Sequence, residues 1–338
     1  CKNSFNFTHD KNFFSIKSNI IIFKMKLKKK PYILIVGSGV LGAYLSKLLL
    51  KKNYNIVVTT RKIRKNFINY EKLKISKKVK FKKLNIQKEK EIEKIINTYN
   101  PIHIYYFAGV SSIAKSFKLS KETQISNYLG AKKFLEVIYK HKFNIKFFKA
   151  NSGYIFQNNN NKINLNSKLT KPFNPYIFAQ IKAYKLIKHH RKLGMNCYSI
   201  IFFNIESLLK PKEFFIKKIC NAVKQEKNIN VGNINNIRDF SWAPEIMKGV
   251  YLLHKINPCD IILGSGKGMS CKQIIKYLFT LKKLNYKKYI NVKKSLYRKN
   301  EKKIIVSSMK ETLRKLKKFK WKPKIFGEKL LYKMYNGL

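Results

Sequence analysis

A glycine-rich turn placed between an apolar run and an amphipathic segment narrows the folds open to this chain. Residues 32–36 predict a buried strand, and Gly37, Gly39 and Gly42 follow it directly. Glycine lets the backbone turn tightly there and lets N–H groups approach a pyrophosphate at a helix N-terminus. We therefore expect this turn, Leu41 included, to bind a dinucleotide cofactor. An ordinary tight turn is the alternative.

Apolar runs recur along the chain and alternate with segments of helical periodicity. They predict strands at 56–60, 80–84, 102–107, 145–150 and 198–203. Strands that alternate with helices are typical of a doubly wound parallel sheet, which binds its ligands at the carboxyl ends of the strands. The sequence therefore predicts an α/β fold with a Rossmann-type sheet.

The residues after the second predicted strand bear on the choice of cofactor. Arg61 and Lys62 stand where a site that prefers NAD usually offers an acidic residue to the ribose. A cationic pair suits the 2′-phosphate of NADP, so we expect NADP as the cofactor. NAD stays possible, because lysine is abundant throughout this chain.

The formal net charge of +58 invites a nucleic-acid interpretation, because basic surfaces attract polyanions. However, only six of the 74 basic residues are Arg, and the lysines are spread through every segment. Specific recognition of phosphates and bases favours the Arg fork. The excess of Lys, Ile, Asn, Tyr and Phe, all with A/T-rich codons, indicates compositional bias instead. We expect no nucleic-acid partner.

No uninterrupted apolar run reaches the roughly 20 residues of a membrane span, so we expect a soluble protein without a membrane partner. The five cysteines are scattered without metal-ligand spacing. This pattern suits a reducing cytoplasm and predicts no metal site. Residues 1–24 lack the ordered regions of a signal peptide, and we expect them to form a poorly ordered N-terminal extension.

A hydroxyl and a phenol mark the expected reaction centre. Ser152 follows the apolar run 145–150, and Tyr176 stands just after two prolines at the head of a predicted helix. Here the sequence resembles the extended short-chain dehydrogenase/reductase family, in which a Ser or Thr orients the substrate and a Tyr-x-x-x-Lys pair passes the proton. The resemblance makes Ser152 and Tyr176 catalytic, but Gln180 stands where the family has its lysine.

The missing lysine matters because its charge helps to hold the phenol as phenolate. A phenol with an unperturbed pKa near 10 is only about 0.1% ionised at pH 7. Lys182 is the next cation along the helix, but at about 100° per residue it projects from another face than Gln180. We do not expect it to substitute.

The same resemblance assigns further positions around the cofactor. Asn85 and Ile86 stand where the family has an Asp-hydrophobic pair near the adenine, and Ala108 and Gly109 resemble the turn beneath the cofactor. Asn127, in a helix predicted at 125–140, falls at the position of the family's active-site Asn or Asp. A solvated residue in mid-helix is the alternative.

Beyond the reaction centre, the sequence is similar to the GDP-mannose 4,6-dehydratase branch of that family. The similar elements keep the family order: 203–207, 214–223, Gly232-Asn233, Arg238-Asp239-Phe240, Arg298 with Glu301, and Trp321-Lys322-Pro323. The resemblance implies that Asn204, Lys218 and Arg238 hold a nucleotide diphosphate. It also implies that Arg298 and Glu301 approach the nucleoside, so GDP-mannose or another GDP-hexose is the expected substrate. For Arg238, a surface salt bridge with Asp239 is the alternative.

Two domains follow from the same resemblance. We expect a Rossmann domain at 25–204, completed by a returning strand at about 259–264. A smaller nucleotide-sugar-binding domain is expected from 205–240 and 265–338, with the active site between the two domains. A homodimer is expected from the resemblance alone.

The expected chemistry begins with hydride transfer from C4 of the hexose to NADP, with Tyr176 as base. A dehydratase then needs the Glu that the family carries two residues after the Ser or Thr, and here this residue is Tyr154. The sequence Ser152-Gly153-Tyr154 is closer to that of nucleotide-sugar 4-reductases. Three hypotheses stay open: a dehydratase-like enzyme, a 4-reductase or epimerase, and a non-catalytic protein that retains the nucleotide and sugar sites.

Overall fold

A parallel sheet of seven strands lies at the centre of the protein, in the order β10-β6-β5-β4-β1-β2-β3. The computed structural model describes residues 30–157, 162–297 and 301–337, and Tyr32–Leu338 forms one compact unit. The strands of the sheet are β1 (Tyr32–Val36), β2 (Asn55–Thr60), β3 (Lys80–Lys83), β4 (His103–Tyr106), β5 (Lys146–Ser152), β6 (Cys197–Phe202) and β10 (Asp260–Leu263). The expected Rossmann-type α/β fold is confirmed.

All strand pairs in this sheet are parallel, so the carboxyl ends of the strands meet at one edge. From β1 the chain runs outwards through β2 and β3, and then returns to β4 on the other side of β1. The strand order reverses at this point, which is where open α/β sheets bind their ligands.

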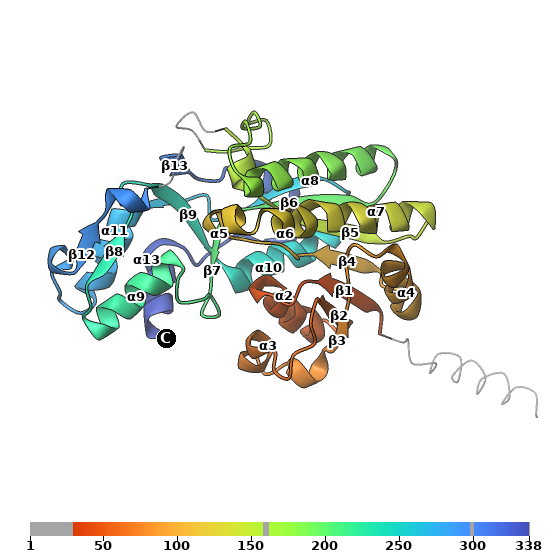
Figure 1. Cartoon of the computed structure of the whole chain (residues 1–338), viewed down its shortest axis with the longest axis horizontal. Coiled ribbons are helices and arrows are strands. Elements are labelled where there is room, and N and C mark those ends of the chain that lie inside the picture. The colour runs from red at the N-terminus through yellow and green to blue at the C-terminus, as the bar shows by residue number, and fades with distance from the viewer. Residues whose placement is uncertain (1–29, 158–161, 298–300, 338) are drawn as a thin grey trace, which may run out of the picture. The chain divides into compact units, whose positions relative to one another are not determined.

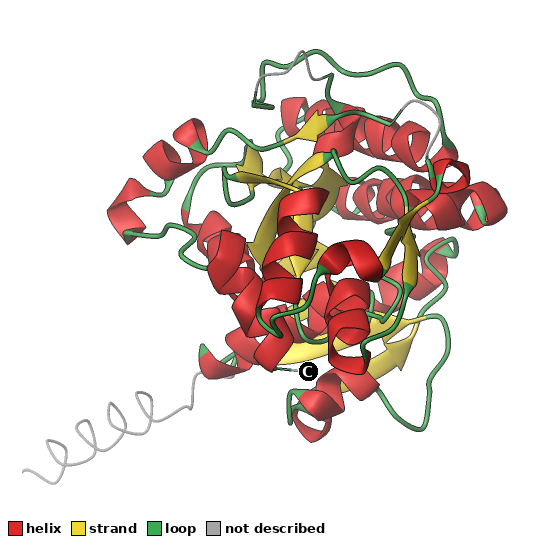
Figure 2. Ribbon diagram, turned by 90° about the vertical axis from the view of Figure 1, so that its left-hand side faces the viewer, coloured by secondary structure: helices red, strands yellow, loops and turns green. Residues whose placement is uncertain are grey.

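Helices cover both faces of the sheet, as Figures 1 and 2 show. One face carries α2 (Val40–Lys51) and α10 (Ala243–Leu252), which pack against each other. The other face carries α4 (Glu89–Tyr99), α7 (Gly130–Lys140) and α8 (Pro175–Lys192). A sheet covered on both faces needs strands that are apolar along their whole length. The sequence of β1 has this pattern.

Alternate residues of β1 belong to different apolar layers. Ile33 and Ile35 pack in the cluster that includes Leu45 of α2, whereas Leu34 packs in the cluster that includes Phe134 of α7. The helices on the second face follow β4 as a chain of short segments: α5 (Ile113–Lys118), α6 (Ser120–Gln124), a π-helical turn (Ile125–Leu129) and then α7. The single helix predicted at 125–140 is therefore two segments, of which the first is π-helical.

A second, four-stranded sheet lies in the C-terminal part, where β9 pairs with β7, β11 and β13. Its strands are β7 (Asn204–Glu206), β9 (Ile237–Trp242), β11 (Gly268–Ser270) and β13 (Ile304–Ile305). The other elements are α3 (Ile68–Lys72), α9 (Phe215–Gln225), β8 (Ile229–Val231), α11 (Cys271–Thr280), β12 (Ile290–Val292), α12 (Lys310–Lys315) and α13 (Gly327–Asn336). Figure 1 shows α9, α11 and α13 grouped beyond β7 and β9.

The returning strand β10 pairs with β6, so a segment from late in the chain completes the central sheet. The division into domains at 25–204, 205–240 and 265–338 stays a prediction, and the expected N-terminal extension at 1–24 lies outside the described residues. In the part of the chain that the structure describes, no helix is long and apolar enough to cross a membrane. The same part holds no cluster of His, Cys, Asp and Glu suited to a metal ion.

Candidate active site

Gly37 and Gly42 hold the turn between β1 and α2 in a shape that a side chain would disturb. Gly37 has a φ of +111°, and its N–H donates to the Thr59 carbonyl at 3.1 Å. A Cβ on Gly37 would lie 2.8 Å from the backbone nitrogen of Ala108, and one on Gly42 would lie 2.6 Å from the Gly37 carbonyl oxygen. These two glycines pack the turn closely against the start of α2 and the chain after β4.

Gly39 differs from its neighbours, because a Cβ there would meet no atom within 4 Å. Gly39 is the N-cap of α2 in an extended conformation, and no side chain caps the first N–H groups of the helix. Uncapped N–H groups at a helix N-terminus favour an anion. The open approach at Gly39 and these donors fit the pyrophosphate of a dinucleotide.

The other predicted cofactor residues follow neighbouring strands. Arg61 follows β2 and is exposed, Asn85 and Ile86 follow β3, and Ala108 and Gly109 follow β4. The Asn85 amide oxygen accepts a backbone N–H two residues further on, and Ile86 is buried. Because β3, β2, β1 and β4 are consecutive in the sheet, the structure brings all these residues to the edge that carries the glycine turn.

Asn127 is buried in the π-helical turn, so the interpretation as a solvated mid-helix residue is wrong. Its amide oxygen accepts the Val110 N–H at 2.8 Å, and its amide nitrogen donates to the Val110 carbonyl at 3.1 Å. A Cβ on Gly109 would collide with that amide oxygen. Asn127 therefore holds the turn after β4 in place with both ends of its amide.

Ser152 and Tyr176 meet at the carboxyl end of β5, where the Ser152 hydroxyl lies near enough to the phenol to lower its pKa. Tyr176 lies in the first turn of α8, which begins there because the Asn174 side chain accepts the Ile177 N–H at 2.8 Å and Pro175 has no N–H to satisfy. Burial raises the pKa of the Tyr176 phenol to about 12, although the Ser152 hydroxyl lowers it. The phenol is therefore protonated at neutral pH.

Gln180 is buried one helical turn after Tyr176, and its amide oxygen has no hydrogen-bond partner among the described residues. Lys182 points elsewhere. Its ammonium lies 4.4 Å from the centre of the Phe178 ring and 5.5 Å from that of Tyr128. A cation for the phenol therefore has to come from another element.

Two residues that the sequence analysis did not single out lie against the segment 153–156. The ammonium of Lys302 donates to the carbonyls of Tyr154 and Phe156, and burial lowers the pKa of Lys302 to about 8. The ring of Phe203 lies 2.7 Å from where a Cβ on Gly153 would stand, so only glycine fits beneath it. Lys302 is one lysine among many in its stretch, so the sequence carries no signal for its position.

The predicted substrate residues are only partly brought together. Arg238 is buried and pairs with Glu301 at 3.2 Å, while a second guanidinium nitrogen donates to the Ile237 and Lys303 carbonyls. The alternative of a surface salt bridge with Asp239 is therefore wrong. Arg298 lies outside the described residues.

Asn204 and Lys218 have partners of their own. The Asn204 amide donates to the Asp239 carbonyl at 3.2 Å, which places it beside Arg238. Lys218 projects from α9, and its ammonium donates to the Asn230 carbonyl at 2.6 Å. The structure therefore joins Asn204, Arg238 and Glu301 around β9, and Lys218 lies towards β8.

The carboxylate of Asp239 holds this part of β9 to the segments around it. This fully buried carboxylate accepts hydrogen bonds from the N–H and hydroxyl of Ser265, the N–H and hydroxyl of Ser307, the N–H of Gly266 and the hydroxyl of Ser241. These donors come from three separate segments. Sequence reasoning missed this role, because hydroxyl and glycine donors so distant in sequence leave no pattern.

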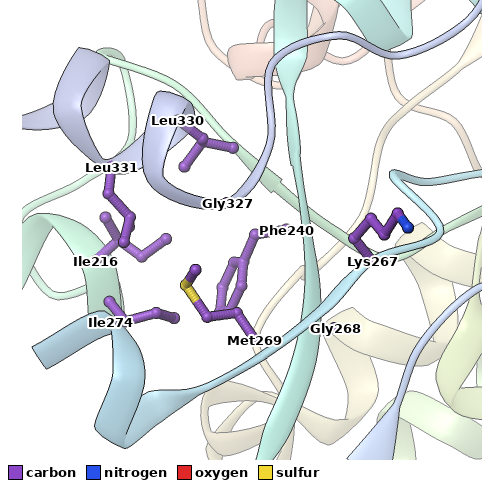
Figure 3. A pocket seen from close by; sticks show the side chains of 9 residues that line it. All are labelled: Ile216, Phe240, Lys267, Gly268, Met269, Ile274, Gly327, Leu330 and Leu331. Atoms are coloured by element: carbon purple, nitrogen blue, oxygen red, sulfur yellow. The ribbon is translucent and has the colours of Figure 1, made fainter. Parts of the chain in front are cut away.

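A small apolar cavity of about 40 Å³ lies in the C-terminal part and is distinct from this site (Figure 3). Ile216, Ile274, Leu330 and Leu331 point into it, and Lys267 lies at its edge. Pockets for small molecules usually measure some 300 to 1,000 Å³, so this cavity does not hold a sugar nucleotide.

A family model described as GDP-mannose 4,6 dehydratase matches residues 34–334, which is most of the chain. The chain belongs to the GDP-mannose 4,6-dehydratase family. This membership confirms the resemblance seen in the sequence. The family's order of elements therefore applies from the glycine turn to the C-terminal helix.

Relatives and solved structures agree with the family. The GDP-mannose 4,6 dehydratase 1 of Arabidopsis thaliana is 25% identical, over 92% of this chain and 90% of its own length. The GDP-mannose 4,6 dehydratase 2 of Caenorhabditis elegans is also 25% identical, over 75% and 71%.

Two solved structures have the same fold at low identity. The dTDP-glucose 4,6-dehydratase of Bacillus anthracis in complex with NAD has a TM-score of 0.78 at 17% identity, over 90% of this chain and 96% of that one. The UDP-glucose 4-epimerase of Thermotoga maritima with UDP-glucose has a TM-score of 0.76 at 17% identity, over 90% and 99%.

Proposed function

We propose that this protein binds a nicotinamide dinucleotide and a nucleotide-linked hexose and catalyses hydride transfer at C4 of the sugar. The buried pair of Ser152 and Tyr176, whose hydroxyls lie near enough to affect the pKa of the phenol, carries the proposal. The pair lies at the sheet edge that also carries the open glycine turn. Hydride transfer at C4 needs a group that takes the proton of the C4 hydroxyl or returns it. This pair supplies such a group at the edge where the sheet binds its ligands.

Each residue then has a distinct part in the reaction. Ser152 orients the oxygen on C4 of the sugar, and Tyr176 takes the proton of that oxygen or returns it. A nicotinamide ring, when bound, accepts or supplies the hydride. Asn127 acts indirectly, because its amide holds the Ala108–Val110 turn in place beside the site.

A 4-keto reductase is the second candidate, and two observations favour it. Burial raises the pKa of Tyr176 to about 12, and a protonated phenol is a donor to a C4 carbonyl. Tyr154 replaces the carboxylate that the dehydratase reaction needs at C5. A reductase needs no base at C5, so both features suit reduction better than dehydration.

We propose NADP as the cofactor and a GDP-hexose as the substrate. The exposed Arg61 at the end of β2 supports NADP, because a guanidinium pairs well with a 2′-phosphate. Arg238 would hold the diphosphate and Glu301 would accept N–H donors of a guanine edge. Family membership supports these two roles, and the ion pair between the two side chains places them side by side. Asn204 beside Arg238 and Lys218 on α9 complete the proposed set.

We further propose a homodimer that forms through the helices around α8. Phe117 of α5, Leu129 of the π-helical turn and Phe178 of α8 are exposed by 61%, 41% and 39%, and these elements pack together. Exposed apolar side chains that gather on adjacent helices mark an association surface. Cys197, Cys220 and Cys259 form no disulfide bond, which supports a reducing compartment such as the cytoplasm.

Turnover of GDP-mannose with NADP tests the proposal. Wild-type protein, Gln180→Lys and Tyr176→Phe are compared, and the reverse assay supplies a GDP-4-keto-hexose with NADPH. We expect Tyr176→Phe to abolish turnover and to leave nucleotide binding unchanged, because it removes the phenol hydroxyl and keeps the ring. Activity in the reverse assay alone would establish the reductase. Full activity of Tyr176→Phe would remove Tyr176 from the mechanism, and nucleotide binding without any turnover would leave the non-catalytic hypothesis.

A further inference from the structure

Lys149 lies inside β5, yet it is only 1% exposed. Its ammonium donates to the Ala150 carbonyl at 2.5 Å and lies 5.4 Å from the centre of the Tyr106 ring. It forms no ion pair within the described residues. An ammonium has three donors, so one carbonyl leaves two of them for other partners. A buried lysine without a carboxylate is costly, and the reaction described above gives this one no role.

Lys149 faces the layer that contains α8. Phe147 stands two residues earlier on the same face of β5 and packs in one cluster with Ile187 of α8. Asn151 stands two residues later and shares that face. The helix itself packs across β5 and β6, so Lys149 and Asn151 point into the layer that also holds Tyr176 and Gln180.

Two buried acceptors in this layer lack partners within the described structure: the amide oxygens of Asn151 and Gln180. Gln180 follows Tyr176 by one helical turn and so lies on the same side of α8. The layer between β5 and α8 therefore holds a buried cation with unused donors, two unpaired oxygens and the reactive phenol.

The ammonium is turned towards the reaction centre. The carbonyl that it meets belongs to Ala150, which comes two residues before Ser152, about 7 Å along the strand. The Ser152 hydroxyl lies near enough to the Tyr176 phenol to lower its pKa. At an effective dielectric constant of about 20, a positive charge about 7 to 10 Å from a phenol favours the phenolate roughly 15- to 50-fold.

We propose that Lys149 is the positioning residue that supplies positive charge to the Tyr176 phenol, a role for which α8 offers only the neutral Gln180. The proposal rests on the proposed function, since it assigns Lys149 a part in hydride transfer. The step itself is unchanged: the proton of the C4 hydroxyl passes to Tyr176, and the ammonium of Lys149 stabilises the phenolate that receives it.

The proposal predicts a particular dependence on pH. Burial lowers the pKa of Lys149 to about 7, whereas burial raises the pKa of Tyr106 on β4 and of Tyr176 on α8. Of these three groups, Lys149 is the one that changes charge near neutral pH. Lys302, whose ammonium meets the Tyr154 and Phe156 carbonyls, loses its charge near pH 8.

Below the pKa of Lys149 the phenolate population rises tenfold per pH unit. Above the pKa of Lys149, each further pH unit removes charge from the ammonium and also favours loss of the phenol proton. These two effects cancel, so the rate levels off until the pH is high enough to ionise the phenol without the ammonium.

The first experiment follows single-turnover hydride transfer to NADP from about pH 6 to about pH 9. It compares the wild type, Lys149→Met and the exchange variant that combines Lys149→Gln with Gln180→Lys. Lys146→Met is the control, because the ammonium of Lys146 meets the His254 carbonyl at the other end of β5.

We expect Lys149→Met to be roughly 15- to 50-fold slower at pH 6 to 7, with a rate that rises through the whole range without levelling off. The exchange variant should recover the rate, since it returns a cation to the layer. Lys146→Met should match the wild type. Identical pH profiles for the wild type and Lys149→Met, or an exchange variant as slow as Lys149→Met, would overturn the proposal.

A second measurement needs no substrate, so it separates this proposal from the proposed function. Tyr176→3-nitrotyrosine introduces a phenol that ionises nearer neutral pH and absorbs visible light when ionised. Adding Lys149→Met should raise the pH at which this phenol ionises by at least one unit, and Lys149→Gln takes its place if Lys149→Met does not fold. An unchanged ionisation would overturn the proposal even if hydride transfer occurs.

Discussion

At the level of single residues, the turn after β1 contains glycines under different constraints. Gly37 has a positive φ and lies against the backbone of Ala108, so its lack of a side chain is a requirement of folding. Gly39 has an ordinary φ of −76° and open space around it. Its lack of a side chain is explained by ligand approach rather than by folding.

Alanine at each position should separate these two roles. Gly37→Ala should lower the free energy of unfolding by at least ~1–3 kcal/mol, because the new Cβ meets strained backbone and a fixed neighbour. Gly39→Ala should change it by less than ~1 kcal/mol and weaken the binding of NADP. Denaturant unfolding and fluorescence titration with the dinucleotide measure the two quantities. Equal losses of stability in both variants would contradict this assignment.

Glu206 of β7 is a buried carboxylate with one oxygen that lacks a partner in the described structure. Burial raises the pKa of Glu206 to about 6, while Lys210 and Lys217 lower it. Between pH 4.5, the ordinary pKa of the group, and pH 6 the native state keeps a proton that the unfolded chain has lost. Stability therefore falls as the pH rises through this window.

Glu206→Gln should remove this pH dependence. Relative to the variant, the wild type should lose about 1.3 kcal/mol of unfolding free energy between pH 4.5 and pH 6, and about 2 kcal/mol over the whole titration. Urea unfolding of both proteins at several pH values measures the difference. Parallel stability curves for the two proteins would show that Glu206 does not ionise in this range.

Among the elements, β9 joins the strands of the four-stranded C-terminal sheet beside the site. It pairs with β7, β11 and β13, and Arg238 and Asp239 project from it to different partners. The positions of most strands and helices could be predicted from apolar runs, because strands buried on both faces leave an uninterrupted signal. The π-helical turn could not, because its residues are as compatible with an α-helix as those of α7.

Asp239→Asn should strongly destabilise the C-terminal part. The substitution turns one oxygen into a donor, which then faces the donors of Ser265, Gly266 or Ser307. We expect a loss of about 2–4 kcal/mol in guanidinium unfolding. Asp260→Asn is the comparison, because Asp260 is less buried and meets only Arg191 and Tyr184 among the described residues. An Asp239→Asn loss no larger than that of Asp260→Asn would count against a central role for Asp239.

At the scale of the whole molecule, the charge of +58 sets the response to salt. The described ion pairs lie mostly at exposed positions and contribute little, so repulsion among lysines dominates. Salt screens this repulsion over about 10 Å at 0.1 M.

We therefore expect the melting temperature to rise by several degrees when NaCl is increased from about 0.02 M to about 0.3 M. Differential scanning fluorimetry measures this rise. Sucrose at matched osmolality is the control, since it changes excluded volume and leaves electrostatics alone. A melting temperature that is flat or falls with salt would mean that attractive pairs outweigh the repulsion.

The sequence by itself determined the family, the Rossmann-type sheet and the positions of the glycine turn, Ser152 and Tyr176, because each depends on residues close together along the chain. Only the tertiary structure decided that Arg238 pairs with Glu301, that Asn127 holds the turn after β4, and that Lys149 is buried beside α8. These contacts join strands and helices far apart in sequence. A lysine-rich composition also conceals the few lysines that are buried, because burial depends on which face of a strand or helix is covered.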